Sequence, residues 1–325
     1  MGAGMNSGGA TIVVTGAAGF IGSHVAAALL ARGDSVVGVD NFDPFYDRSI
    51  KEANLARVRT VSPAFECAEL DICDEAALEA LCARVRPTGV IHLAARAGVR
   101  PSVADPVGYA RVNVLGTASV QRAAERSGCR RLVMASSSSV YGNNEKTPFS
   151  EDDRVDRPIS PYASTKRSCE MIASAHQHLT GMPTACLRFF TVYGPGQRPD
   201  LAIAKFMRLI RDGKPITMYG DGSMSRDYTY IDDIVAGVLA AHDRIDSFGY
   251  RIWNLGSDRP VRLDTLIEQI GEVTGRTPRI ERSDPPPGDV ERTWADLTRV
   301  REELAYAPTM DRLEGLSRQW ASMGA

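Results

Sequence analysis

Short hydrophobic segments alternate with longer amphipathic ones up to about residue 189. Brief apolar runs rich in β-branched residues, typical of buried strands, occur at residues 11–14, 35–39, 90–93, 131–135 and 184–187. Apolar residues at helical spacing lie between them, at residues 21–31, 75–85, 109–127 and 162–179. This alternation predicts an α/β fold with a doubly wound parallel sheet and right-handed crossovers.

The alternation becomes less regular in the last part of the chain. Proline and glycine cluster there at residues 194–199, 220–222 and 285–288, with shorter helical stretches between them. These breaks favour a smaller, mixed α/β C-terminal lobe built around a cleft. We expect a flexible N-terminus (1–10), a first domain (11–188) and a second lobe (189–325), of which 226–255 returns to the first domain.

A glycine-rich turn follows the first predicted strand and opens the first predicted helix. Gly16 would permit the tight turn, Gly19 would let the backbone approach a diphosphate, and Gly22 would let the helix pack closely on the strand. The diphosphate would lie at the helix N-terminus, where free N–H groups point at it. The turn therefore predicts a dinucleotide site, with Phe20 and Ile21 beside the ligand.

Asp40 ends the second predicted strand, about 20 residues after the glycine-rich turn, as in dinucleotide-binding folds. A carboxylate there can accept hydrogen bonds from both ribose hydroxyls and would repel a 2′-phosphate, so it favours NAD over NADP. The alternative is a residue that only caps a helix or turn. Further cofactor contacts, each with a structural alternative, are predicted for Asn41, Asp71, Ile72, Leu93, Ala94, Ala95 and Asn113.

A tyrosine and a lysine open the predicted helix 162–179, and serines 136–139 end the strand before it. The spacing places Tyr162 and Lys166 on one helical face. A free phenol titrates near about 10, so tyrosine is a poor base unless cations such as Lys166 and an oxidised nicotinamide stabilise its phenolate. Tyr162 would then remove a hydroxyl proton while hydride leaves the same carbon for NAD, and Ser137 would hold the oxygen. Either pattern alone arises by chance, but their combination with the glycine-rich turn favours catalysis.

Taken together, these motifs resemble the extended short-chain dehydrogenase/reductase superfamily, and within it the NAD-dependent nucleotide-sugar epimerases. The resemblance covers essentially the whole chain and includes segments 92–95, 188–195, 226–233 and 287–289. It implies a Rossmann-type fold, a nucleoside-diphosphate sugar substrate, and a homodimer formed through the helices 109–127 and 162–179. In the family, the residue matching Arg226 contacts the diphosphate and the one matching Asp289 contacts the ribose. Prolines stand where the family often has a basic residue, so the second diphosphate cation would be Arg292 or Arg282.

Segments 40–47, 97–100, 189–195 and 196–200 are most similar to UDP-glucuronate 4-epimerases. UDP-galactose 4-epimerases usually have asparagine where Thr191 stands. A C6 carboxylate would need a charge-assisted partner, for which Arg198 is the candidate, unless it is only a solvated loop cation. The remaining predicted substrate contacts are Thr191, Ser138, Ser139 and Arg100. Arg96 replaces a frequent glutamine, and the sequence does not explain why.

Ser138 and Ser139 also bear on the reaction, because related dehydratases and decarboxylases typically carry a carboxylate at this point. An aliphatic hydroxyl is too weakly acidic to move a proton at C5. We therefore expect C4 epimerisation of UDP-glucuronate to UDP-galacturonate through a 4-keto intermediate, with NAD retained. The alternatives are a UDP-glucose/UDP-galactose 4-epimerase, a UDP-glucuronate decarboxylase, an NDP-sugar 4,6-dehydratase and a non-catalytic NAD-sensing regulator.

The composition of the chain argues against several classes of binding partner. With 38 Lys and Arg against 40 Asp and Glu, the formal net charge of −2 offers no global field for nucleic acid or an anionic membrane. The six cysteines form no Cys-x-x-Cys pair, which argues against a metal site and favours free thiols in a reducing compartment. No apolar run approaches the roughly 20 residues of a membrane span, and residues 1–10 do not resemble a signal peptide. We expect a cytoplasmic enzyme that holds its anionic substrate with a few placed cations.

Overall fold

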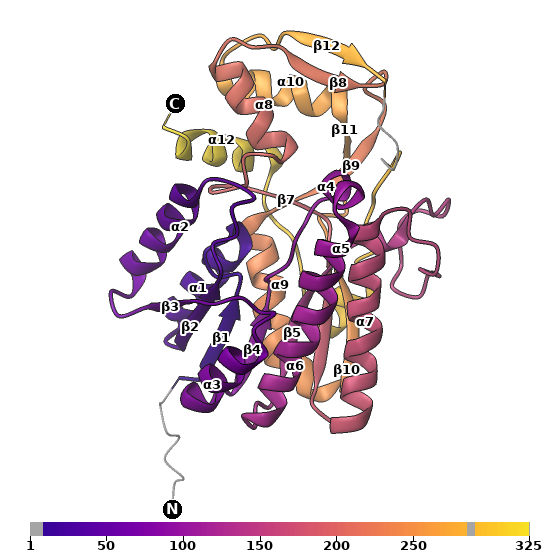
Figure 1. Cartoon of the computed structure of the whole chain (residues 1–325). Helices are drawn as coiled ribbons and strands as arrows, with labels where there is room; N and C mark the ends of the chain where they lie inside the picture. Colours follow the sequence, from indigo (N-terminus) through magenta and orange to yellow (C-terminus); the bar gives the residue numbers. More distant parts are fainter. Residues whose placement is uncertain (1–8, 285–289, 325) are drawn as a thin grey trace, which may run out of the picture.

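A seven-stranded sheet forms the centre of the protein in the computed structural model, which describes residues 9–284 and 290–324 (Figure 1). All neighbouring strands in this sheet are parallel. Their spatial order is β10 (Tyr250–Leu255), β6 (Thr184–Phe189), β5 (Leu132–Ser137), β4 (Gly89–His92), β1 (Thr11–Thr15), β2 (Ser35–Asp40) and β3 (Glu66–Glu69). The order reverses between β1 and β4, and ligands bind at the carboxyl ends of the strands at such a point. The predicted doubly wound parallel sheet is confirmed.

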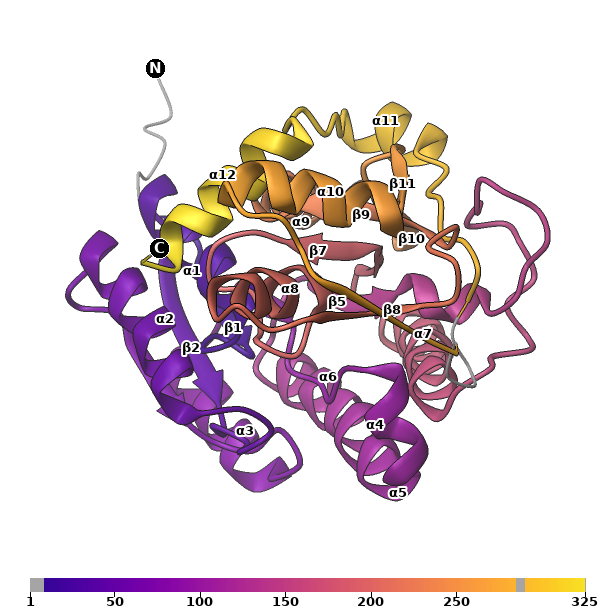
Figure 2. The ribbon, with the colours of Figure 1, turned by 90° about the horizontal axis from the view of Figure 1, so that it is seen from above.

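Helices cover both faces of the sheet, as Figure 2 shows from above. One layer contains α1 (Phe20–Arg32), α2 (Arg48–Val61) and α9 (Ile231–Arg244), which pack on one another. The other contains α3 (Glu75–Val85), α6 (Gly116–Arg126) and α7 (Pro161–Thr180). Every residue of β4, β5 and β6 is buried, as parallel strands covered on both faces require.

The predicted helix 109–127 is interrupted at its start. The chain first forms the short helices α4 (Val99–Ala104) and α5 (Pro106–Tyr109), and then a π-helical turn at Ala110–Leu115 before α6. Such turns are frequent at functional sites. This one contains Asn113, which is 1% exposed and contacts the loop after β4.

A smaller lobe lies above the carboxyl ends of the central strands (Figure 1). Its three-stranded sheet has the order β11 (Pro260–Arg262), β9 (Ser225–Tyr230) and β7 (Thr191–Tyr193). A parallel pair joins β8 (Ile216–Tyr219) to β12 (Ile280–Ser283). In the lobe, α10 (Leu263–Thr274) packs on α8 (Ala202–Arg211) and α12 (Arg312–Ser322), whereas α11 (Thr298–Leu304) packs on α9 and β10. Between β9 and β11 the chain runs back to the central sheet, where α9 packs on α1 and β10 pairs with β6.

None of the helices in residues 9–284 and 290–324 is long and apolar enough to cross a membrane. Nor does this part of the chain bring together three or more His, Cys, Asp or Glu side chains that could hold a metal ion.

Candidate active site

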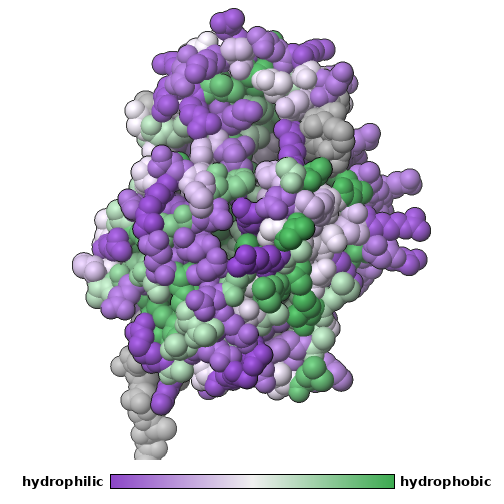
Figure 3. All heavy atoms as spheres, in the orientation of Figure 1, coloured by the Kyte–Doolittle hydropathy of each residue, from purple (hydrophilic) through white to green (hydrophobic). Residues whose placement is uncertain are grey.

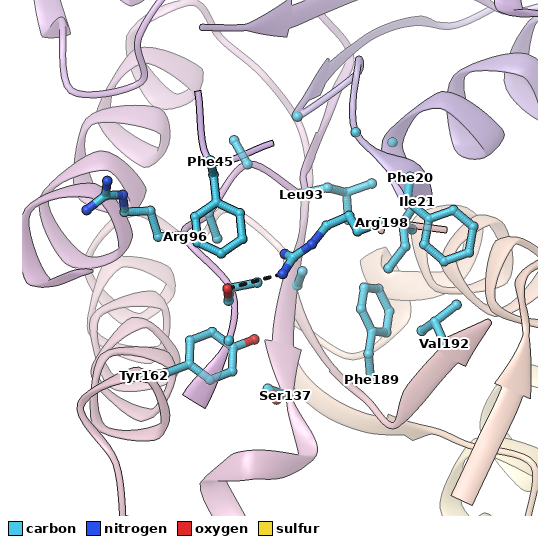
Figure 4. Close-up of a pocket in the computed structure, with 18 of the residues that line it drawn as sticks. Phe20, Ile21, Phe45, Leu93, Arg96, Ser137, Tyr162, Phe189, Val192 and Arg198 are labelled. Carbon is cyan, nitrogen blue, oxygen red and sulfur yellow. Dashed lines mark hydrogen bonds between the residues drawn. The ribbon is translucent and has the colours of Figure 1, made fainter. Parts of the chain in front are cut away.

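A cavity of about 540 Å³ opens at the carboxyl ends of the central strands, where the order of strands reverses. Its walls come from the glycine-rich turn, the end of β2, the loops after β4, β5 and β7, and the start of α7. Figure 4 shows side chains from these elements pointing into one space. The predicted site residues in its lining are Gly16, Gly19, Phe20, Ile21, Gly22, Asp40, Asn41, Ile72, Leu93, Ala94, Ala95, Ser137, Ser138, Ser139, Tyr162, Lys166, Thr191 and Arg198.

The glycine-rich turn leaves room for a ligand at the N-terminus of α1. Gly16 has φ +72°, and a Cβ there would lie 2.8 Å from the Ala94 nitrogen. A Cβ on Gly22 would lie 2.0 Å from the Gly16 carbonyl oxygen, so only glycine permits this approach of helix to strand. No side chain caps α1, and its first turn has no acidic residue. The N–H groups of that turn are therefore suited to an anion such as the diphosphate of a dinucleotide.

Asp40 lies at the end of β2, where both oxygens of its carboxylate accept hydrogen bonds from the protein. Its Oδ2 accepts a hydrogen bond from the Ala18 nitrogen at 3.1 Å. Its Oδ1 accepts one from the Phe42 nitrogen at 2.9 Å and one from Lys51 Nζ at 3.2 Å. Both charged side chains of this pair are 7% exposed, and both line the cavity. The sequence prediction missed Lys51, which α2 supplies beside the predicted ribose ligand.

The start of α7 fixes the positions of the tyrosine and the lysine. Ser160 caps the helix by accepting a hydrogen bond from the Ala163 nitrogen at 3.1 Å, and proline occupies the first turn. The Tyr162 nitrogen donates to Ser102 Oγ at 3.1 Å, while its phenol points into the cavity (Figure 4). One turn later, the buried Lys166 Nζ donates to the Ala135 carbonyl at 2.8 Å. Helix and strand together thus place an ammonium group and a phenol in one cavity.

The serines at the end of β5 (Leu132–Ser137) and just after it have separate roles. Ser137 Oγ accepts a hydrogen bond from the Ser139 nitrogen at 3.1 Å and donates one to Ser139 Oγ at 3.2 Å, so it stays at the cavity wall. Ser136 Oγ instead donates to Glu170 Oε1 at 2.6 Å. Burial would raise the pKa of Glu170, but hydrogen bonds and charge from Arg188 outweigh it, so the pKa is lowered. The buried Glu170–Arg188 pair anchors the strand end that carries Ser137.

A buried histidine, His92, lies near Lys166 but does not provide a second base. His92 Nδ1 lies 2.7 Å from Thr15 Oγ1, and its Nε2 lies 3.1 Å from Thr117 Oγ1. Burial, together with the charge of Lys166, lowers the pKa of His92 to about 3. The imidazole is therefore neutral at physiological pH and links β1, β4 and α6.

Arg198 extends into the cavity from the loop after β7, as Figure 4 shows. Its Nε and Nη2 donate to the two carboxylate oxygens of Asp200 at 3.0 and 2.7 Å, and Nη2 reaches the Ala97 carbonyl at 3.4 Å. The guanidinium also lies 5.1 Å from the centre of the Phe45 ring. Burial would lower the pKa of Arg198, but the hydrogen bond and charge of Asp200 raise it, so the side chain stays charged. It is 15% exposed, unlike a solvated loop cation.

Two predicted cofactor residues support the site from outside the cavity lining. Asp71 accepts hydrogen bonds from Asn41 Nδ2 at 3.1 Å and from the Cys73 nitrogen at 2.8 Å, which shapes the turn after β3. Asn113 Oδ1 accepts from the Arg96 nitrogen at 2.8 Å, and its Nδ2 donates to the Arg96 carbonyl at 3.0 Å. Both side chains therefore brace loops that line the cavity.

The other predicted substrate residues that the structure describes also lie outside the cavity lining. The Arg100 guanidinium lies 4.6 Å from the centre of the Tyr219 ring. Arg226 Nη1 donates to the carbonyls of Ser225 and Glu291 at 3.0 and 3.2 Å. A β-bridge between Ser225 and the exposed Arg292 brings that residue beside β9. Arg282 is exposed on β12, and Asp289 lies outside the described residues.

Several lining residues were not predicted as site residues. Those with an aromatic or charged side chain are Asp43, Phe45, Tyr46, Lys51, Arg96, Phe189 and Phe190. Arg96 forms an ion pair with Asp105 and lies 3.8 Å from Asp43, so it connects the loops after β2 and β4. The resemblance of segment 40–47 to the glucuronate enzymes was the available signal for Phe45 and Tyr46. It did not show that these residues face the cavity.

Comparisons with known proteins agree with this geometry. Residues 12–256 match the model of the NAD dependent epimerase/dehydratase family. A probable UDP-glucuronate 4-epimerase from Rhizobium meliloti (strain 1021) is 40% identical, with 94% of this chain and 94% of that protein covered. The structure of UDP-glucuronic acid 4-epimerase from Bacillus cereus, with UDP-glucuronic acid and NAD, is 33% identical with a TM-score of 0.91, covering 97% of this chain and 99% of that one. UDP-glucose 4-epimerase from Thermotoga maritima, with UDP-glucose, is 32% identical with a TM-score of 0.88, and the coverage is 97% and 98%.

Proposed function

Because the chain belongs to the NAD-dependent epimerase/dehydratase family, we propose that it is a UDP-glucuronate 4-epimerase, an isomerase that interconverts UDP-glucuronate and UDP-galacturonate. The observation that carries this proposal is one cavity that contains the glycine-rich turn, the Tyr162–Lys166 pair and the Arg198 cation. The cofactor of the family is NAD, and the cradle at Gly16 and Gly22 fits its diphosphate.

Tyr162 would act as the general base at the C4 hydroxyl of the sugar. Its phenolate requires a nearby cation, and the buried Lys166, held by the Ala135 carbonyl, supplies one. Ser137, whose hydroxyl is oriented by Ser139, would hold the C4 oxygen during proton transfer. When bound in the cradle at Gly16 and Gly22, NAD would supply the reversible hydride chemistry at C4. Epimerisation then requires the 4-keto sugar to turn over about its diphosphate and present its other face.

Arg198 would hold the C6 carboxylate, with hydroxyls of Thr191, Ser138 and Ser139 as further donors, since all four line the cavity. After oxidation at C4 the sugar is a β-keto acid, which loses carbon dioxide when its C5–C6 bond stands perpendicular to the carbonyl plane. Charge-assisted hydrogen bonds from Arg198 would keep that bond near the plane. The same contacts therefore serve recognition and suppress decarboxylation.

A UDP-glucose 4-epimerase is the second candidate, because the Thermotoga maritima enzyme is nearly as similar in fold. A neutral C6 hydroxymethyl group has no need of a guanidinium. The placement of Arg198 inside the cavity therefore favours the acidic sugar. Incubation of the purified protein with UDP-glucuronate, UDP-glucose and dTDP-glucose, followed by NMR of the products, tests both candidates. UDP-galacturonate from the first substrate is the expected result, and UDP-xylose as the main product would overturn the proposal.

We further propose that residues 11–188 form the NAD-binding domain and that residues 189–325 mainly hold the nucleotide sugar, with 226–255 returning to the NAD-binding domain. The pairing of β10 with β6 supports the return of that segment. Arg226 and the neighbouring Arg292 are proposed to contact the diphosphate, together with Asp289 at the ribose. Arg100, in α4, is proposed to contact the substrate.

A homodimer through the layer of α4 to α7 is also proposed. Exposed apolar side chains on these elements and the π-helical turn are Val103, Val107, Leu115, Met171 and Leu179. Figure 3 shows apolar residues gathered over the same region. Large exposed apolar patches often mark protein interfaces. The molar mass in solution, measured by light scattering, tests this proposal.

A further inference from the structure

Gln319, in the last helix, is a buried polar residue that the proposed catalytic machinery does not use. It belongs to α12, is 1% exposed and lies outside the residues 12–256 that match the family. Its Oε1 accepts a hydrogen bond from the Gly194 nitrogen at 2.9 Å. Its Nε2 donates to Gln197 Oε1 at 2.8 Å. The side chain thus connects the C-terminal helix to the loop that carries Arg198.

Gln197 extends this connection in two directions. Its Nε2 donates to the Val192 carbonyl at 2.8 Å, at the centre of β7. Its Oε1, besides the bond from Gln319, accepts one from the Ala204 nitrogen at 3.0 Å, in the first turn of α8. The two amides therefore tie the end of β7 and the beginning of α8 to one another and to α12.

The segment fixed in this way leads directly to Arg198. Gly194 and Gly196 have φ of +141° and +78°, so the backbone turns sharply just before the arginine. Such glycine turns need external hydrogen bonds to hold one conformation, because glycine loses more conformational freedom on ordering than any other residue. The Arg198 side chain contacts Asp200, the Ala97 carbonyl and the Phe45 ring. Asp200 belongs to the same loop, so the position of this ion pair depends on the backbone that Gln197 and Gln319 hold.

An apolar side chain at position 319 would fill the same volume without any polar group to satisfy. Burying an amide costs free energy unless its hydrogen bonds are made, and a partner left unpaired destabilises the folded state. Gln319→Leu would leave the Gly194 N–H and one bond of Gln197 unsatisfied. The lost hydrogen bonds would destabilise the loop around Gly194 and Gln197 rather than the apolar packing of α12.

We infer that Gln319 is a positioning residue that acts through Gln197 to hold Arg198 at the sugar end of the cavity. It thereby controls binding of the acidic sugar and retention of its carboxylate. This inference rests on the proposed function, since it assigns Arg198 to the C6 carboxylate. Gln319 itself does not line the cavity, so its effect on the sugar would pass through Gln197 and Arg198.

The test compares Gln319→Leu with Ser317→Ala. Ser317 lies on the exposed side of the same helix, where its hydroxyl donates to the Leu313 carbonyl. The probes are UDP-glucuronate and UDP, which lacks the sugar. We expect Gln319→Leu to weaken UDP-glucuronate binding about fivefold to tenfold, leave UDP binding within twofold, and raise the share of UDP-xylose among the products. Ser317→Ala should change none of these. An equal loss of affinity for UDP would overturn the inference.

Two further measurements separate positioning from a general structural effect. In an Arg198→Ala background, Gln319→Leu should have no additional effect on the product ratio or on UDP-glucuronate binding, because both act through one guanidinium. Additive effects would contradict the inference. Gln197→Met should behave like Gln319→Leu, and it decides the question if the Leu variant does not fold.

Hydrogen exchange distinguishes failure of this inference from failure of the proposed function. Gln319→Leu should speed exchange of the backbone amides in segment 192–201, whatever the substrate is. If the parent protein makes no UDP-galacturonate, the proposed function is wrong and the exchange result still decides the positioning. Unchanged exchange in this segment would show that Gln319 does not hold it.

Discussion

Arg198, which lines the same cavity as Tyr162, donates through its guanidinium to both carboxylate oxygens of Asp200, at 3.0 and 2.7 Å. An acidic sugar would therefore find a cation that already has a carboxylate partner. The substrate would have to share Arg198 with Asp200 or displace it. Because paired and hydrogen-bonded charges retain their orientation, this arrangement presents Arg198 in a fixed direction before the sugar arrives.

Replacement of Arg198 should change which product forms. Arg198→Ala removes the charge that holds the C6 carboxylate, so the keto acid should lose carbon dioxide more readily. We expect UDP-glucuronate binding to weaken about tenfold or more and the share of UDP-xylose to increase, measured by NMR of the products. Asp200→Asn, which keeps the cation, is the matched comparison and should retain epimerisation. Unchanged product ratios in Arg198→Ala would remove Arg198 from this role.

Tyr162→Phe should abolish oxidation at C4 while leaving NAD bound. Only the phenolic hydroxyl is removed, and the contact of the Tyr162 backbone with Ser102 remains. Loss of a general base lowers turnover by about a hundredfold or more. Absorbance near 340 nm after addition of UDP-glucuronate reports the reduction of bound NAD, and the extracted NAD content is the control. Turnover within tenfold of the parent protein would assign the base elsewhere.

Asp40→Asn should relax the choice of cofactor because it leaves Lys51 in the cavity wall without its carboxylate partner. An unpaired ammonium at the ribose end is suited to a 2′-phosphate, so NADP binding should improve while NAD binding weakens by about tenfold. Calorimetric titration with NAD and NADP measures the ratio. The double variant Asp40→Asn with Lys51→Met should lose the gain for NADP. If both variants keep the same NAD to NADP ratio, Lys51 has no part in selection.

The stability of the protein should fall in mild acid through His92. Its folded pKa is about 3, below the ordinary value of 6.5, so the unfolded chain binds the extra proton between these values. The contribution of neutral His92 to the free energy of unfolding is complete above about pH 6.5. It decreases as pH falls toward 3, and the decrease reaches about 2 kcal/mol by pH 5. Urea unfolding at pH 7.5 and pH 5.0 should show a smaller pH dependence in His92→Gln than in the parent protein. Equal pH dependence would contradict the assignment.

The sequence was sufficient for the parts of the site that local chemistry determines. The glycine turn, the Tyr162–Lys166 pair at the start of α7 and the serines at the end of β5 each need particular residues at fixed spacing, so their pattern is visible in the chain. All of them line the cavity. The central strands were equally visible, because burial on both faces leaves continuous apolar runs.

Contacts between distant segments were not predictable in the same way. β3 begins and ends with glutamate at the edge of the sheet, where solvent removes the need for an apolar run. Lys51 meets Asp40 only because α2 folds back beside β2. Asn113 has the polarity expected of a cofactor ligand, yet its hydrogen bonds go to Arg96 and Thr165. These outcomes depend on tertiary packing that spacing along the chain does not encode.

The return of the chain to the central sheet through α9 and β10 affects how the molecule can move. The chain passes between the central sheet and the lobe before β7, after β9 and before β11. Several backbone connections, rather than one hinge, therefore join the two parts. An opening motion would have to bend all of these connections together. In the proposed reaction the sugar would turn over between these connected parts, so clearance around its ring would limit how fast it inverts.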